Sequence, residues 1–134
     1  MNEKPLILLV DDEENFLEIF STELQTAGFE VVAVNSGEAA LAKLKEIRPA
    51  LVLLDVEMPE QNGAETLEKI RTDPNLSGLK VAFLTNLGNP DKSLQWTDEK
   101  FAREAGAIDY IKKTDDLENV SRQIQKIISG VPNS

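Results

Sequence analysis

Five short apolar runs constrain the fold of this chain more than any other feature of its sequence. Each run is four to six residues long and rich in Val, Ile or Leu; they are Leu6–Val10, Val31–Val34, Leu51–Leu54, Leu79–Leu84 and Ile108–Ile111. Continuous apolarity, in place of strict alternation, is typical of strands that are buried on both faces. The runs therefore predict five short strands covered by other elements on both sides.

Helix-like spacing of apolar side chains fills the stretches between the runs. The first stretch predicts a helix that ends at Gly28, because glycine is common just after the last turn of a helix. The members of its apolar stripe are Phe16, Phe20, Leu24 and Ala27. Ser36 predicts the N-cap of a second helix, which we expect to run until Pro49 interrupts it. Thr114 predicts the N-cap of a last helix, with Asp115 and Asp116 in its first turn.

Strand and helix thus alternate along the whole chain. This alternation predicts an α/β fold in which helices cover both faces of a five-stranded parallel sheet. Right-handed crossovers leave few topologies, and among them we expect the flavodoxin-like, doubly wound order 2-1-3-4-5. With 134 residues, the chain is predicted to form a single domain over 1–134, with a core over about 5–129 and a tail over 130–134.

Polar residues follow four of the predicted strands where sites form in open α/β sheets, at the carboxyl ends. Asp11 and Asp12 follow the first strand, and Asp55 follows the neighbouring third strand. Three close carboxylates repel one another unless they bind a cation, and oxygen ligands favour Mg²⁺. Thr85 ends the fourth strand, and Lys112 and Lys113 end the fifth. A hydroxyl and a lysine beside a metal suit phosphoryl transfer, in which a carboxylate serves as the nucleophile.

Composition narrows the chemistry further. The chain has no cysteine and no histidine, which excludes thiolate catalysis, disulfides and imidazole acid–base chemistry. Its net charge of −10 argues against binding nucleic acid or anionic membranes through a general electrostatic footprint. The sequence has no long apolar run and no signal peptide, so we expect a cytoplasmic protein.

The motifs at the strand ends resemble those of the receiver domain of two-component signalling, as found in stand-alone, chemotaxis-regulator-like proteins. The resemblance covers about Leu6 to Ile128. It rests on Leu8-Leu9-Val10-Asp11-Asp12-Glu13, Leu53-Leu54-Asp55-Val56-Glu57-Met58-Pro59 with Asn62-Gly63, Phe83-Leu84-Thr85, and Ala105-Gly106-Ala107-Ile108-Asp109-Tyr110.

The resemblance implies a role for each site residue. Asp55 would be the phosphoacceptor, and Mg²⁺ would be held by Asp11, Asp12, Asp55 and the backbone carbonyl of Glu57. Of the two lysines, the family pattern selects Lys113, in agreement with strand alternation, which allows only one of them to face the pocket.

The resemblance also implies a switch and a set of partners. Thr85 would move toward the phosphoryl group, and Tyr110 would follow inward as the second switch residue. The phosphoryl donor would be a sensor histidine kinase or a histidine phosphotransfer protein, and output would pass to a downstream protein target. The protein would be a monomer or a phosphorylation-dependent dimer, and it would catalyse only its own phosphorylation and dephosphorylation.

Three features depart from the family pattern. Thr114 stands where a proline normally follows the lysine, and Asn86 stands where a small residue normally follows the switch threonine. The segment from Asn86 to Glu104 is a few residues longer than usual and holds the only tryptophan, Trp96. Trp96 is interpreted either as a hydrophobic staple with Phe101 or as part of a partner surface.

Three other functions are weighed against the phosphorylated switch. One is a receiver-like interaction module that is never phosphorylated, although all the charged site residues are present. Another is a phosphatase with an aspartyl nucleophile, in which Glu57 would stand in the position of the general acid. Flavin binding is disfavoured because Asp11, Asp12 and the two glutamates after them would repel a phosphate.

Overall fold

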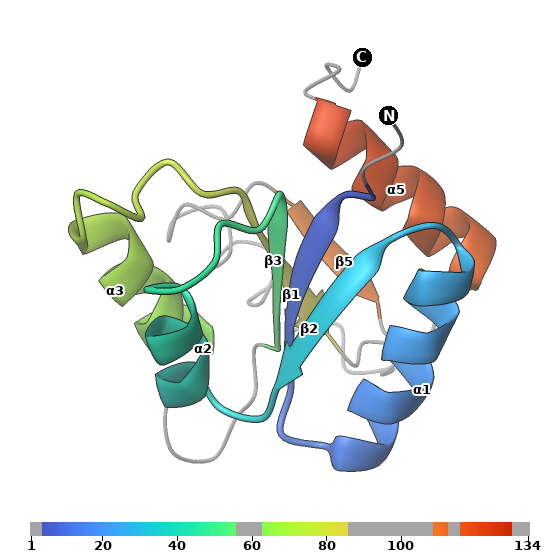
Figure 1. The fold of residues 1–134 in the computed structure, drawn as a ribbon, viewed down its shortest axis with the longest axis horizontal. Coiled ribbons are helices and arrows are strands. Elements are labelled where there is room, and N and C mark those ends of the chain that lie inside the picture. The colour runs from blue at the N-terminus through green and yellow to red at the C-terminus, as the bar shows by residue number, and fades with distance from the viewer. Residues whose placement is uncertain (1–3, 56–62, 86–108, 113–115, 130–134) are drawn as a thin grey trace, which may run out of the picture.

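A computed structural model describes residues 4–55, 63–85, 109–112 and 116–129, and every structural statement below concerns these residues (Figure 1). The elements are β1 (Leu6–Val10), α1 (Glu14–Thr26), β2 (Glu30–Val34), α2 (Gly37–Lys43), β3 (Leu51–Asp55), α3 (Gly63–Thr72), β4 (Val81–Thr85), β5 (Asp109–Lys112) and α5 (Leu117–Ser129). Each apolar run of the sequence therefore overlaps a strand, and the predicted α/β class is confirmed. The longer segment with Trp96 and the tail 130–134 lie outside the described residues.

The five strands form one parallel sheet of order β2-β1-β3-β4-β5, as expected for a flavodoxin-like fold. The register places Val10 of β1 opposite Leu54 of β3, and Asp55 opposite Leu84 of β4. The carboxyl ends of β1, β3 and β4 therefore meet at one edge of the sheet. This edge is called the site edge below, and the edge where the strands begin is called the opposite edge.

Helices cover both faces of the sheet and bury two separate apolar clusters. On one side lie α2 and α3, and on the other lie α1 and α5 (Figure 1). Within β1, Leu8 and Val10 belong to the cluster that includes residues of α2 and α3, whereas Ile7 and Leu9 belong to the cluster of α1 and α5. All four side chains are fully buried. Burial on both faces explains why the sequences of β1 and β3 are continuously apolar. The prediction of cover on both sides was wrong for β2, whose residues are exposed or half-buried because it is the outermost strand of the sheet.

The ends of α1 and the start of α2 follow the sequence prediction. Gly28 has a φ of +105°, the left-handed conformation that glycine adopts without strain. The backbone N–H of Phe29 donates to the carbonyl of Leu24 at 3.0 Å, and that of Gly28 donates to Gln25 at 3.1 Å, which is the Schellman pattern. At α2, the Ser36 hydroxyl accepts the backbone N–H of Ala39 at 3.0 Å, so the predicted cap is confirmed.

Two helix limits differ from the prediction. α2 ends at Lys43 instead of continuing toward Pro49. The N–H of Glu46 donates to the carbonyl of Lys43, three residues back, so the chain tightens into a turn before the proline is reached. α5 begins at Leu117, and Asp116 caps it by accepting the N–H of Asn119 at 2.9 Å. The expectation of Asp116 within the first turn was wrong, because aspartate is itself a preferred N-cap.

No helix in the described ranges combines the length and apolarity needed to cross a membrane.

Candidate functional site

The site edge brings together acids that are far apart in the sequence. Asp11 directly follows β1, and Asp55 is the last residue of the adjacent strand β3. Because the two strands are parallel and in register, the polar residues at their ends have to emerge side by side. The sequence-based prediction that the first and third strands carry neighbouring carboxylates is therefore confirmed for these residues.

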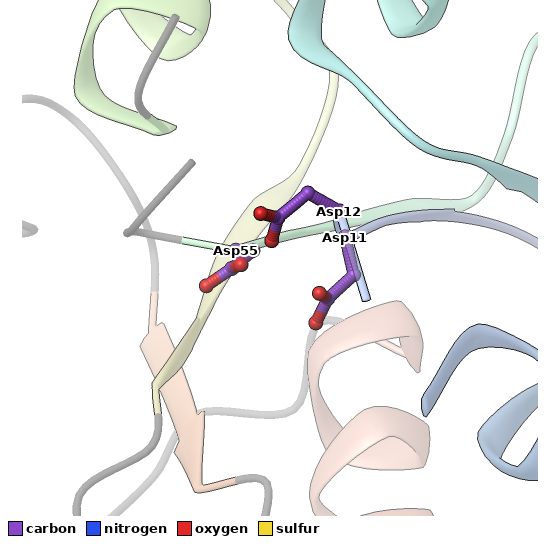
Figure 2. Close-up of side chains that lie close together, drawn as sticks. All are labelled: Asp11, Asp12 and Asp55. Atoms are coloured by element: carbon purple, nitrogen blue, oxygen red, sulfur yellow. The ribbon is translucent and has the colours of Figure 1, made fainter. Parts of the chain in front are cut away.

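Three carboxylates form the site, as Figure 2 shows. One oxygen from each of Asp11, Asp12 and Asp55 lies within 4.8 Å of the other two. Asp11 is fully buried and Asp55 is 4% exposed, whereas Asp12 is exposed to solvent. The cluster thus combines two buried carboxylates with one that is open to water.

Backbone contacts fix the position of Asp11. Its N–H donates to the carbonyl of Val34 at 3.2 Å, which extends the hydrogen bonding between β1 and β2 by one residue. Its Oδ1 accepts the N–H of Glu13 at 2.9 Å, just before α1 begins. This contact of the Glu13 amide was not predicted, although an aspartate two residues before a helix-starting acid is a recognisable signal for such a turn.

The electrostatics of the cluster call for a cation. Two ionised carboxylates at this separation repel by about 3 kcal/mol at an effective dielectric constant of about 20. A divalent cation between the carboxylates attracts each of them and so outweighs their mutual repulsion. Carboxylate oxygens and water are the ligands that Mg²⁺ prefers. The donor set is oxygen only, with two buried carboxylates and one exposed, so these residues fit Mg²⁺ that keeps several waters.

For the other predicted site residues, the structure gives at most the position in a strand. Thr85 is the last residue of β4 and is paired with Lys112 of β5, so the backbones of both reach the site edge. Tyr110 lies in β5 opposite Phe83. Glu57 and Lys113 lie outside the described residues, and their roles stay predictions.

The chain matches known proteins over most of its length. A sequence model of the family described as the response regulator receiver domain matches residues 7–125. The "Probable transcriptional regulator ycf27" of Pyropia yezoensis is 36% identical across 99% of this chain. That match spans 55% of the relative, so the chain covers about half the length of this curated protein.

Solved structures agree on the fold. The chemotaxis protein CheY4 of Vibrio cholerae superposes with a TM-score of 0.79 and 26% identity, covering 93% of this chain and 99% of that one. The receiver domain of sensor histidine kinase PA1611 from Pseudomonas aeruginosa PAO1, described with a magnesium ion coordinated in its active site cleft, has a TM-score of 0.81. It is 24% identical and covers 95% of this chain and 99% of that one, a likeness that concerns the fold.

Proposed function

This chain belongs to the response regulator receiver domain family, and from that membership we propose that it is a signalling switch that accepts a phosphoryl group on Asp55. The observation that carries the proposal is the cluster of Asp11, Asp12 and Asp55 at one edge of the sheet. A single acid there would have many explanations. Three acids brought together from two strands fit a metal-assisted site that handles phosphate.

The transfer can be written with its atoms balanced. A carboxylate oxygen of Asp55 attacks the phosphorus of a phosphohistidine on a kinase or phosphotransfer protein. The P–N bond breaks as the P–O bond of an acyl phosphate forms, and the histidine nitrogen of the donor leaves with the bonding electron pair and takes a proton.

The residues around Asp55 would bind the metal ion and the phosphoryl oxygens. Asp11 and Asp12 would hold Mg²⁺ together with Asp55 and the backbone carbonyl of Glu57. The metal would neutralise charge on the phosphoryl oxygens during transfer. The Lys113 ammonium would pair with a phosphoryl oxygen, and the Thr85 hydroxyl would donate a hydrogen bond to another.

Thr85 and Tyr110 would carry the change to the surface. Contact of Thr85 with the phosphoryl group would favour one of two conformations, with Tyr110 moving inward in that state. Output would then pass by contact with a downstream protein. Beyond its own phosphorylation and dephosphorylation, we propose no enzymatic activity.

Intact-mass measurement after incubation with acetyl phosphate tests this proposal. The parent should gain one phosphoryl group in the presence of Mg²⁺ and none in its absence, and Asp55→Asn should gain none. Asp73→Asn is the matched control, because Asp73 lies at the end of α3, at the opposite edge of the sheet, and should leave labelling unchanged.

Three results would contradict the proposal. Full labelling of Asp55→Asn would place the phosphoryl group elsewhere. An unlabelled parent, with Mg²⁺ present, would favour the unphosphorylated interaction module. Sustained hydrolysis of an aryl phosphate by the parent, abolished in Asp55→Asn, would favour the phosphatase.

A further inference from the structure

A second concave surface lies at the opposite edge of the sheet, away from the three acids. It is a groove of about 930 Å³ between the end of α2 and the turn that follows α3. Its apolar lining comes from Leu41, Leu44, Ile47 and Leu76. Leu44 and Leu76 are buried in the core cluster, and Leu41 and Ile47 pack against that cluster while staying half-buried. The floor of the groove is therefore continuous with the core.

Basic side chains flank this floor on both sides. Lys45 and Arg48 come from the segment after α2, and Lys69 comes from the last turn of α3. Of the two acids in the lining, Glu46 already pairs with Lys43 at 3.6 Å. Asp73, the second acid, accepts the N–H of Asn75 through Oδ1 at 2.9 Å. The lining thus holds three basic side chains against two acids and has a formal charge of +1, on a chain whose net charge is −10.

Lysines near helix C-termini stabilise the helix dipole, so their charge alone would not indicate a ligand. Here the charges border an apolar floor, and Lys45 and Lys69 form no ion pair with any residue in the described part of the chain. Both side chains are exposed and keep their ammonium groups available.

Hydrogen bonds hold the two walls of the groove together. Arg48 Nη1 donates to the carbonyl of Asn75 at 2.7 Å, which joins the segment after α2 to the turn after α3. Arg71 Nη1 donates to the carbonyls of Ser77 at 2.9 Å and Leu79 at 2.6 Å, which fixes the remainder of that turn. Because these contacts already fix the walls, a ligand can bind without the loss of conformational entropy that ordering them would require.

We propose that this groove binds an acidic peptide segment of a partner protein, with an apolar side chain on the floor and carboxylates beside Lys45 and Lys69. Charge on both walls favours a peptide, because a fatty acid or a single phosphate carries its charge at one end only. Complementary charge raises the rate of association with the partner, and the apolar contact lowers the rate of dissociation. The proposal goes beyond phosphoryl transfer and does not depend on Asp55.

Fluorescence anisotropy with designed peptides tests it. The probes are fluorescein-labelled peptides of about twelve residues that place one leucine between glutamates at varied spacings, an extent suited to a groove of this size. Matched probes carry glutamine in place of every glutamate. At low salt we expect at least one glutamate probe to bind, its glutamine counterpart to fail, and about 0.5 M NaCl to weaken binding strongly.

Variants of the protein locate the binding surface. The double charge reversal K45E/K69E should weaken binding about tenfold, since it removes two exposed charge contacts and adds repulsion. Lys126→Glu on α5 is the matched control and should leave binding unchanged. Leu41→Ala should weaken binding several-fold, whereas Ile19→Ala, at a side chain 61% exposed on α1, should not. Circular dichroism checks that each variant is folded.

Several outcomes would overturn the proposal. These are no binding by any glutamate probe, equal binding by the glutamine probes, or equal loss in Lys126→Glu and K45E/K69E. Binding to phosphatidylserine vesicles that K45E/K69E abolishes, without peptide binding, would assign the groove to a membrane surface. A concentration-dependent dimer in sedimentation that the same variant abolishes would assign it to a second copy of the chain. Phosphoryl labelling of Asp55 should be normal in K45E/K69E, so either proposal can fail without the other.

Discussion

The two edges of the sheet differ in how their charged side chains are arranged. At the site edge, three carboxylates gather within 4.8 Å of one another. At the opposite edge, cations reach backbone carbonyls: Lys80 Nζ donates to Ile127 at 2.9 Å and Ile128 at 3.0 Å, and Arg48 and Arg71 make similar contacts. One edge accumulates repulsion that a ligand can relieve, and the other uses charge to hold the fold together.

This contrast teaches that the charged groups that lower stability and those that raise it lie at opposite ends of the strands. Binding sites commonly carry groups that lower stability, and the rest of the fold compensates for them. Here the compensation comes from the buried strands and from cation–carbonyl contacts at the far edge. The predictions below test this separation by changing one edge at a time.

The largest effect is expected from Lys80→Met at the opposite edge. Loss of two charged hydrogen bonds at the end of α5 should lower the free energy of unfolding by about 2 kcal/mol. Lys126→Met makes the same change at an exposed position of the same helix and should cost less than about 0.5 kcal/mol. Urea denaturation measures both, and equal losses would show that the contacts of Lys80 contribute nothing special.

A metal-dependent effect is expected at the site edge. Mg²⁺ at about ten times its dissociation constant should stabilise the parent by about 1.4 kcal/mol. Asp12→Asn should lose most of this gain, and Glu18→Gln, an exposed acid on α1, should keep it. Thermal unfolding with MgCl₂ is compared with NaCl of equal ionic strength; an unchanged response in Asp12→Asn would remove Asp12 from the metal site.

The start of α5 gives the next effect. Asp116→Ala should lower the free energy of unfolding by about 1 kcal/mol, because Asp116 accepts the N–H of Asn119. Ser36→Ala should cost a similar amount at α2. Thr114→Ala is the informative comparison in the same denaturation series, since a greater loss there than at Asp116 would restore Thr114 as the cap.

The smallest effect concerns repulsion alone. Without Mg²⁺, Asp12→Asn should raise the free energy of unfolding by roughly 0.5 kcal/mol, because it removes one of three like charges from a partly exposed site. Added NaCl should shrink the difference between variant and parent. A variant less stable than the parent at low salt would mean that Asp12 makes a favourable contact that outweighs the repulsion.

The sheet could be predicted from the sequence because its signal is local. Side chains such as Leu8 and Leu9 face opposite clusters and are both buried, so apolarity alone marks the strand. The order of the strands followed from connection rules. The clustering of Asp11 with Asp55 followed in turn, because acids at the ends of adjacent parallel strands have to meet.

Other features depend on distances that no local pattern reveals. The contacts of Lys80 join residues 47 and 48 positions apart in the sequence, and the Arg48 contact joins residues 27 positions apart. The start of α5 was misjudged because Thr114 and Asp116 are both residue types that cap helices, and the local sequence does not decide between them. The roles of Glu57, Lys113, Tyr110 and Trp96 stay predictions.

The attachment of α5 at its two ends has a mechanical consequence. Its last turn is tied by Lys80 to the start of β4, the strand that ends at Thr85, while its first turn is held by the cap of Asp116. The Asp116 cap joins residues at the start of α5 itself, so of these two contacts only that of Lys80 ties the helix to the sheet. The last turn should therefore be the first part of α5 to fray when Lys80 is replaced, because the buried side chains of Val120 and Ile124 hold the middle of the helix in the core.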